Sequence, residues 1–320
     1  MADITEVNAN IDLMQLRYFV AVVDAGSISK ASRLCNIAQP ALSKRIANLE
    51  FAMRVPLLHR GHTGIRATEQ GLLLYQAAQR VLHDMAKVID QVHSAEDNPV
   101  GEVRVGCVNS LTRMIGPALA RRVREAYPNV RLSFVAGQSG DLYRALCDGL
   151  LDLGLLVHDK EIGSLDIDLL LTEELFLVAS PDLPGLPPED VIAPEQLSGL
   201  PFVFPTARSF ASGRYLLEYL RHRGIHLNIQ AEIDGEAIRD LIAGSFGACI
   251  LPASFVESDI ASGRVCLKRL RDLPLRRDLA LCSANDRPRT LAARVLAREL
   301  KQMLTEELMR TAWRHVRIAG

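Results

Sequence analysis

The stretch from Ala25 to Thr68 reads AGSISKASRLCNIAQPALSKRIANLEFAMRVPLLHRGHTGIRAT. It contains one acid, Glu50, whereas the whole chain of 320 residues is balanced, with 37 basic and 38 acidic residues. A compact basic segment on a nearly neutral chain indicates a polyanionic partner. The basic residues of the stretch are Lys30, Arg33, Lys44, Arg45, Arg54, Arg60 and Arg66.

The first part of this stretch predicts a short helix. Ser27 or Ser29 is suited to cap its N-terminus, because a serine hydroxyl accepts a hydrogen bond from a free amide of the first turn. The apolar residues recur at a spacing of three, so we expect them to face inward. They are Ile28, Ala31 and Leu34.

The second part predicts another helix after a turn at Asn36-Ile37-Ala38. Pro40 is in the first turn, where proline is tolerated because its missing N–H would have no helical partner. One face is apolar, formed by Leu42, Ile46 and Leu49. Two short helices joined by a tight turn are typical of a helix-turn-helix, whose second helix enters the major groove of DNA. An ordinary helical hairpin with a solvated charged face is the alternative.

A small hairpin is predicted after the second helix. Val55-Pro56 interrupts the helical pattern, and two short extended pieces, 57–60 and 64–67, flank residues 61–63. His62 is better suited to a phosphate contact than to a metal, because no acid or cysteine stands beside it. Polar and basic side chains on the second helix and the hairpin are suited to base edges and phosphates. The DNA-binding residues that we predict are Ser29, Gln39, Pro40, Ser43, Lys44, Arg60, His62 and Arg66.

These segments also carry a family resemblance. LRYFVAVVDAGSISKAS, NIAQPALSKRIANLE, VPLLHR and ATEQG together resemble the N-terminal domain of LysR-type transcriptional regulators, without gaps from about Leu13 to Gly71. IAQPALS and LLTEELFLVASPDLPG resemble the nitrogen assimilation control branch of that family. Ser32 and Leu58 depart from the usual alanine and phenylalanine. Ala38 stands where many members have serine, so one N-cap of the recognition helix is missing.

A long helix is predicted from about Glu69 to His93, capped by Thr68. Apolar residues recur in it at alternating spacings of four and three, which is a heptad pattern. We expect a coiled-coil dimer, and an amphipathic helix packed on its own domain is the alternative. The helix would span on the order of 37 Å. The dimerisation residues are Leu74, Ala78, Val81, Met85, Val88 and Val92.

Composition favours a globular protein that stays in the cytoplasm. Hydrophobic residues make up 48% of the chain, and no apolar run reaches the roughly 20 residues that span a bilayer. The first residues, MADITEVNANIDLM, include acids and lack the apolar core of a secretory signal. Six cysteines are scattered without a C-x-x-C pair, so we expect buried thiols, and a redox-sensing pair is the alternative.

The rest of the chain predicts an α/β fold. SAEDNPVG, at 94–101, is polar and carries proline and glycine, so we expect a hinge at 94–100. Strands and helices then alternate twice as far as residue 311, which is typical of two open α/β units. Separate strands are expected at 168–171 and 175–179. The expected domains are a winged helix-turn-helix at 11–69, a linker helix at 69–93 and a regulatory domain at 101–311. The resemblance implies that this last domain is a two-lobed effector domain like a periplasmic binding protein.

Polar loops follow several of the expected strands. Ligands of open α/β sheets bind outside the carboxyl ends of the strands, where helix N-termini present free amides. Each loop taken singly is also an ordinary capped turn. The resemblance implies an effector cleft between two lobes, with Ser110, Gln138 and Thr206 at positions that contact effectors, and Arg208 suggests an anionic ligand. The effector-binding residues that we predict are Ser110, Thr112, Gln138, Ser139, Thr206, Arg208 and Phe246.

An enzyme is not favoured. The sequence has no G-x-S-x-G, H-E-x-x-H, Walker A or G-x-G-x-x-G motif, and His158 has no nucleophile beside it in sequence. We therefore expect no catalytic residue, metal or cofactor. The predicted function is a transcriptional regulator with duplex DNA, a small effector, other copies of the chain (a homodimer or homotetramer) and RNA polymerase as partners. A ligand-independent LysR-type regulator and a stand-alone α/β ligand-binding protein or enzyme are the alternatives.

Overall fold

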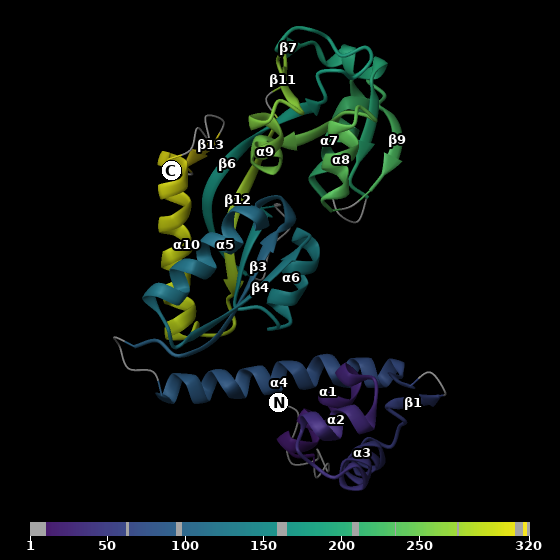
Figure 1. Ribbon diagram of the computed structural model, residues 1–320, viewed down its shortest axis with the longest axis vertical. Helices are drawn as coiled ribbons and strands as arrows, with labels where there is room; N and C mark the ends of the chain where they lie inside the picture. The colour runs from purple at the N-terminus through teal and green to yellow at the C-terminus, as the bar shows by residue number, and fades with distance from the viewer. Residues whose placement is uncertain are drawn as a thin grey trace. The chain divides into compact units, whose positions relative to one another are not determined.

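The computed structural model describes residues 11–61, 64–93, 98–158, 165–206, 211–233, 235–273, 275–310 and 316–318; at 211–216, 307–310 and 316–318 it describes the backbone alone. The chain divides into two compact units, Met1–Val92 and His93–Gly320. Figure 1 draws the helices and strands of both units as ribbons. Among the described helices, none has the length and apolar character of a membrane span.

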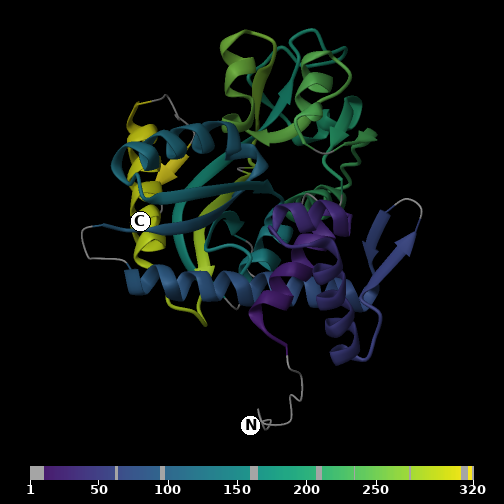
Figure 2. The same cartoon turned by 60° about the horizontal axis from the view of Figure 1, so that its bottom comes forward.

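The N-terminal unit is built from helices and one hairpin. In chain order it contains α1 (Leu13–Ala25), α2 (Ile28–Leu34), α3 (Gln39–Met53), β1 (Leu58–Gly61), β2 (Gly64–Ala67) and α4 (Glu69–His93), whose last residue lies beyond the unit boundary. The first three helices enclose a core that includes Phe19, Val22 and Ala31, all fully buried. The hairpin stands out from these helices as a wing (Figure 2).

Local sequence explains where the helices of this unit begin. Asp12 and Gln15 form a reciprocal capping box at the start of α1. The Ser27 hydroxyl accepts a hydrogen bond from the backbone N–H of Lys30 at 3.4 Å, so Ser27 and not Ser29 caps α2. α3 begins at Gln39 after Ala38, which makes no side-chain cap bond, as its methyl group requires. Thr68 accepts from the Gly71 N–H at 2.9 Å and caps α4.

The predicted inward face of α3 is confirmed, and that of α2 is partly wrong. Leu42, Ile46 and Leu49 are fully buried. Leu34, expected to face inward, has 77% of its surface exposed. Two steps of three residues turn a helix by about 600°, so the third residue lies about 120° away from the first. The face of α2 therefore leaves the core before the helix ends.

The C-terminal unit alternates strands and helices. Its first lobe contains β3 (Gly101–Val108), α5 (Asn109–Ala126), β4 (Val130–Gly137), α6 (Ser139–Cys147), β5 (Leu153–His158), most of β6 (Leu165–Ala179), β12 (Arg276–Ala284), α10 (Leu291–Arg310) and β13 (Val316–Ile318). The second lobe contains the end of β6, β7 (Val191–Ile192), η2 (Pro194–Gly199), β8 (Pro201–Phe204), α7 (Ala211–His222), β9 (Asn228–Glu232), α8 (Ala237–Ala243), β10 (Cys249–Pro252), η3 (Ala253–Val256), α9 (Glu257–Ala261) and β11 (Cys266–Leu270).

The sheet of the first lobe brings helix N-termini to one edge. Its strand order is β4-β3-β5-β12-β6, and β3 runs parallel to both β4 and β5. α5 follows β3 and α6 follows β4, so both helices begin at the carboxyl edge of the sheet. α5 packs against α10, and α6 packs on β3, β5 and β12. A Cβ at Gly106 would lie 2.6 Å from a methyl carbon of Leu151 and 2.9 Å from one of Leu142, so glycine permits this close approach of α6.

The two strands expected at 168–171 and 175–179 are one continuous strand, β6, of 15 residues. The polar run at 172–174 suggested a break. The structure keeps this run in the sheet because Glu173, only 1% exposed, is paired with Arg277 of β12. β6 pairs with β12 in the first lobe and with β10 and β11 in the second, and both β6 and β12 reach the junction of the lobes (Figure 1).

The second lobe and the chain end add strands that the sequence did not predict. β7 pairs with β11, and β13 pairs with Leu171–Glu173 of β6 on the side opposite β12. Two apolar clusters fill the second lobe, one around Phe202 and Ile250 and the other around Phe176 and Ile242. The first lobe has its own core around Leu119, Leu155 and Leu296.

Candidate DNA interface and ligand cleft

The DNA-binding residues predicted on the helices lie at the start of α3 and on α2. Gln39, Pro40 and Lys44 are exposed, and Ser43 is half-buried. They occupy the part of α3 that its buried face, Leu42, Ile46 and Leu49, leaves open. Ser29 is exposed on α2. The polar start of α3 is thus available to the major groove, as a recognition helix requires.

The wing separates its two predicted arginines. Cross-strand pairing sets His59 opposite Arg66 and Arg60 opposite Ile65. Side chains on one strand alternate between the faces of the sheet, so Arg60 and Arg66 lie on different faces. Arg66 is exposed, and no described residue forms an ion pair with it. His62, the third predicted wing residue, lies outside the described residues.

Glu50 contacts Arg60, one of the predicted DNA-binding residues, and the sequence pattern assigned it no role. Its Oε1 accepts hydrogen bonds from the backbone N–H groups of Leu57 and Leu58 at 2.9 and 3.1 Å. Its Oε2 lies 3.5 Å from Nη2 of Arg60. In the sequence, the feature that distinguished Glu50 was its position as the single acid of a basic stretch. Glu50 ties the end of α3 to the first strand of the wing.

The predicted dimerisation residues differ in exposure along α4. Leu74 packs partly against the core of the N-terminal unit, and Ala78 is buried. The later residues of the seam are exposed, by 44% at Val81, 43% at Met85, 52% at Val88 and 77% at Val92. The second half of α4 therefore presents a row of apolar side chains to the outside of the chain.

A cavity of about 510 Å³ lies between the two lobes of the C-terminal unit. Its lining includes Asn109, Thr112 and Arg113 of α5 from the first lobe, and Glu236 and Arg239 from the second. Of the predicted effector-binding residues that the structure describes, only Thr112 is part of this lining. Arg113 Nη1 lies 3.3 Å from Glu236 Oε2, so one ion pair joins the lobes across the cavity.

The second-lobe wall of the cavity is a network of charges. Arg239 is buried and donates from Nε to Asp259 at 2.8 Å, from Nη1 to Glu236 at 2.9 Å and from Nη2 to Ser258 at 2.6 Å. Arg264 pairs with the other oxygen of Asp259. Burial lowers the pKa of Arg239, but the bonds to Asp259 and Glu236 outweigh it and raise the pKa above its ordinary value. Arg239 therefore stays charged.

A second polar network lies where β6 and β12 meet. Arg277 Nη2 donates to Ser110 Oγ at 2.9 Å, and Arg277 Nε donates to Glu173 Oε2 at 2.7 Å. Ser254 of η3 donates to Glu173 Oε1 at 2.5 Å. Ser110 belongs to the first lobe and Ser254 to the second, so the network crosses the junction. Ser110 was predicted from sequence; its partners Arg277 and Glu173 were not.

The other predicted effector-binding residues are distributed between the lobes. Gln138 occupies the N-cap position of α6 without a side-chain cap bond, and Ser139 Oγ accepts from the Val157 N–H at 3.2 Å. Thr206 follows β8 in the second lobe and is half-buried. Phe246 is 47% exposed. Arg208 lies outside the described residues.

The cysteines divide into two groups. Cys107, Cys249 and Cys282 are buried, whereas Cys35, Cys147 and Cys266 are only partly buried, so the expectation of buried thiols is wrong for these three. Burial raises the pKa of Cys107 and of Cys282 to about 12 each. These two thiols stay protonated at neutral pH and are poor nucleophiles. Within the described ranges, no cluster of three His, Cys, Asp or Glu side chains is arranged to hold a metal.

Comparison with protein families decides the identity of both units. Residues 13–72 match the bacterial regulatory helix-turn-helix protein family of the lysR type, and residues 96–305 match the LysR substrate binding domain. The chain belongs to the LysR family. A LysR-type chain is a DNA-binding transcriptional regulator with an effector-binding domain and not an enzyme, so the enzyme alternative is excluded.

Two curated LysR-type relatives are similar over most of the chain. The nitrogen assimilation regulatory protein nac of Klebsiella aerogenes is 30% identical over 250 residues, which cover 78% of this chain and 80% of the relative. The probable cat1 operon transcriptional activator of Acinetobacter lwoffii is 30% identical over 250 residues, with coverages of 76% and 81%. The full-length CbnR structure in complex with its target DNA has a TM-score of 0.68, 20% identity and coverages of 92% and 100%, and shares the fold.

Proposed function

We propose that a small anionic metabolite binds between the lobes of the C-terminal unit and thereby changes how this LysR-type regulator acts on DNA. The observation that carries the proposal is the pair of helix N-termini at one sheet edge. α5 and α6 begin after the adjacent parallel strands β3 and β4, and neither N-terminus has a side-chain cap bond. Free amides and the positive end of the helix dipole favour an anion.

The predicted contact residues fit such a ligand. Ser110 and Thr112 belong to the first turn of α5, and Gln138 and Ser139 begin α6. Hydroxyl and amide groups add donors to the backbone N–H groups. Thr206 comes from the second lobe, so a ligand that reached both sides would favour one arrangement of the lobes. Arg208 and Phe246 complete the proposed set.

The polar network at the lobe junction, formed by Ser110, Arg277 and Glu173, could transmit ligand binding to a movement of the lobes. Arg277 donates to Ser110, so a ligand that takes the Ser110 hydroxyl changes the partners of Arg277. Arg277 and Glu173 lie on the two long strands that meet at the lobe junction. A ligand shifts the equilibrium only if it binds one arrangement more tightly than the other. The difference in ligand affinity between the two lobe arrangements would come from these contacts.

The test replaces Ser110 and Thr206 by alanine together. Operator binding should remain and the response to the inducer should be lost, because the DNA-binding unit is untouched. The matched control is Ser198→Ala with Thr305→Ala, two exposed residues of the same unit outside the cleft. Induction and operator affinity are measured side by side. A double variant of Ser110 and Thr206 that still responds fully would place the ligand elsewhere.

A ligand-independent regulator is the second candidate, and two contacts favour it. The Ser110 hydroxyl already has Arg277 as a partner, and the Arg113–Glu236 pair already joins the lobes. The chain itself therefore supplies contacts that an effector would otherwise make. A parent protein that regulates equally well with no metabolite present would favour this candidate.

The proposed assembly is a homodimer formed through α4, and two dimers would form a homotetramer. The exposed apolar residues Val81, Met85, Val88 and Val92 support the dimer, because a coiled-coil seam buries such residues against a partner. The proposed domains are 11–69 for DNA binding, 69–93 for the linker helix, 94–100 for the hinge and 101–311 for regulation. RNA polymerase is the proposed further partner, and the cytoplasm the proposed location.

A further inference from the structure

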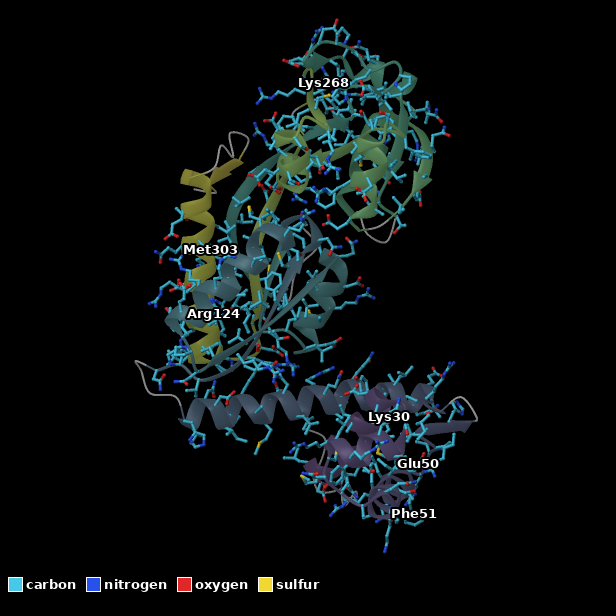
Figure 3. All side chains as sticks on the ribbon, in the orientation of Figure 1. Lys30, Glu50, Phe51, Arg124, Lys268 and Met303 are labelled. Carbon is cyan, nitrogen blue, oxygen red and sulfur yellow. The ribbon has the colours of Figure 1, made fainter. Side chains whose placement is uncertain are left out.

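Glu50 stands at the junction of two parts of the DNA-binding unit. It lies near the end of α3, beside the exposed Phe51 (Figure 3). Its two carboxylate oxygens have different partners. Oε1 accepts from the N–H groups of Leu57 and Leu58, where the wing begins, and Oε2 faces the Arg60 guanidinium. The carboxylate therefore makes two neutral backbone contacts and one charged contact.

The register of the wing explains why Arg60, and not Arg66, meets this carboxylate. Arg60 is paired with Ile65, which packs partly against the core, so both side chains lie on the face toward the helices. Arg66 is paired with His59 on the other face. One wing arginine is thus directed back to the protein, and the other to the outside.

The Glu50–Arg60 pair remains open to competition. The side chain of Glu50 is 20% exposed and that of Arg60 is 50% exposed. An ion pair in contact with water is weak and is screened by salt. A DNA phosphate offers Arg60 the same kind of anionic oxygen, so the carboxylate and the phosphate compete for one guanidinium.

We propose that Glu50 is a positioning residue for DNA binding with two separable roles. Through Oε1 it fixes the wing to the end of the recognition helix. Through Oε2 it withholds Arg60 from the phosphate backbone. The second role lowers affinity for DNA of any sequence, because phosphate contacts carry no sequence information, and so raises the relative weight of the base contacts of α3.

Glu50→Gln separates the two roles. The amide oxygen still accepts from Leu57 and Leu58, but the negative charge that holds Arg60 is gone. Affinity for a random duplex should rise several-fold at low salt. The slope of log affinity against log salt should steepen by about 0.9 for each bound DNA-binding unit, since one more phosphate is neutralised. In the double variant Glu50→Gln with Arg60→Gln, the added slope should disappear.

The matched control is Glu69→Gln, which removes an exposed acid from the first turn of α4 in the same unit. It should leave the slope unchanged. An unchanged slope in Glu50→Gln, an equal change in Glu69→Gln, or a change that persists in the double variant would each overturn the withholding role.

Glu50→Ala tests the anchoring role. Hydrogen exchange of the Leu57 and Leu58 amides should accelerate in Glu50→Ala and stay near the parent rate in Glu50→Gln. Exchange measured in the intact chain reports the protection of these two amides individually, even if Glu50→Ala lowers overall stability. Equal exchange in the two variants would overturn the anchor.

Discussion

Each of the two units contains an ion pair between an arginine and a glutamate, and the two pairs differ in how far their side chains are exposed to solvent. In the C-terminal unit, Arg277 and Glu173 form a pair whose side chains are only 10% and 2% exposed. In the N-terminal unit, the corresponding pair, Arg60 and Glu50, is 50% and 20% exposed. Exposed apolar residues occur in both units, but on α4 they fall at the heptad spacing, at Val81, Met85, Val88 and Val92.

This difference separates internal structure from partner binding. A buried pair is costly to break, because the remaining charge has no water and no partner. An exposed pair contributes little to stability and can exchange its partner. At the lobe junction the C-terminal unit buries the Arg277–Glu173 pair, whereas the N-terminal unit leaves the Arg60–Glu50 pair and the apolar residues of α4 exposed. We propose that these exposed groups contact DNA and a second chain.

The largest effect is expected on α4. Val81→Lys with Met85→Lys puts two charges into the proposed seam, where burial without partners is costly. We expect monomeric or aggregated protein and loss of operator binding. The control is Gln76→Lys with Ala86→Lys, at two exposed positions of the same helix outside the seam. Sedimentation that shows the parent oligomer in the seam variant would mean that α4 packs within its own chain.

Breaking the Arg277–Glu173 pair at the lobe junction should cause the largest loss of stability. Arg277→Met leaves Glu173 buried without its cationic partner, and we expect a loss of about 3–5 kcal/mol in the free energy of unfolding. Arg277→Met with Glu173→Leu should recover most of that loss, because both charges are removed. Urea unfolding of the intact chain measures both variants. A single variant as stable as the parent would show that the junction does not depend on this pair.

The start of α3 should matter for DNA and not for folding. Gln39→Ala and Ser43→Ala should each cost about 1–3 kcal/mol in binding free energy at the specific site. The thermal midpoint should stay the same, since both side chains lie outside the buried face of α3. Operator affinity equal to that of the parent in a well-folded double variant would remove these residues from the interface.

The smallest effect concerns two helix ends of the N-terminal unit. Gly26, the C-cap residue after α1, has φ 59°, and Arg54, the C-cap residue after α3, has φ 56°. A side chain in this left-handed region costs about 1 kcal/mol, so Arg54→Gly should stabilise and Gly26→Ala should destabilise by that amount. A Cβ at Gly26 meets only one atom, at 3.8 Å, so its cost is conformational. Thermal shifts of the same sign would contradict this account.

Sequence periodicity predicted the N-terminal unit well because its helices bury one face each. Leu42, Ile46 and Leu49 follow the helical repeat and are all fully buried. The prediction that Leu34 faces inward was wrong, because residues at a spacing of three move progressively around the helix. Local sequence also predicted the missing side-chain cap at Ala38 and the cap at Thr68.

The lobe junction was not predictable in the same way. Glu173 and Arg277 are 104 residues apart, and each alone reads as a surface charge. The polar run at 172–174 suggested a strand break, because its partner was not visible in the local pattern. Among the expected effector-binding residues, Ser110 was predicted in part from its place after a strand, but its hydrogen bond with Arg277 depends on tertiary structure. Glu50 was likewise noticed only as a charge.

We expect the N-terminal unit to bind DNA by neutralising phosphates with its exposed basic residues. The most direct measurement is the affinity of the full chain for a duplex of random sequence across a range of salt concentrations. Log affinity should fall linearly with log salt, and Arg66→Gln should reduce the steepness of that slope by about 0.9 per bound unit. A flat salt dependence in the parent, or an unchanged slope in Arg66→Gln, would contradict the account.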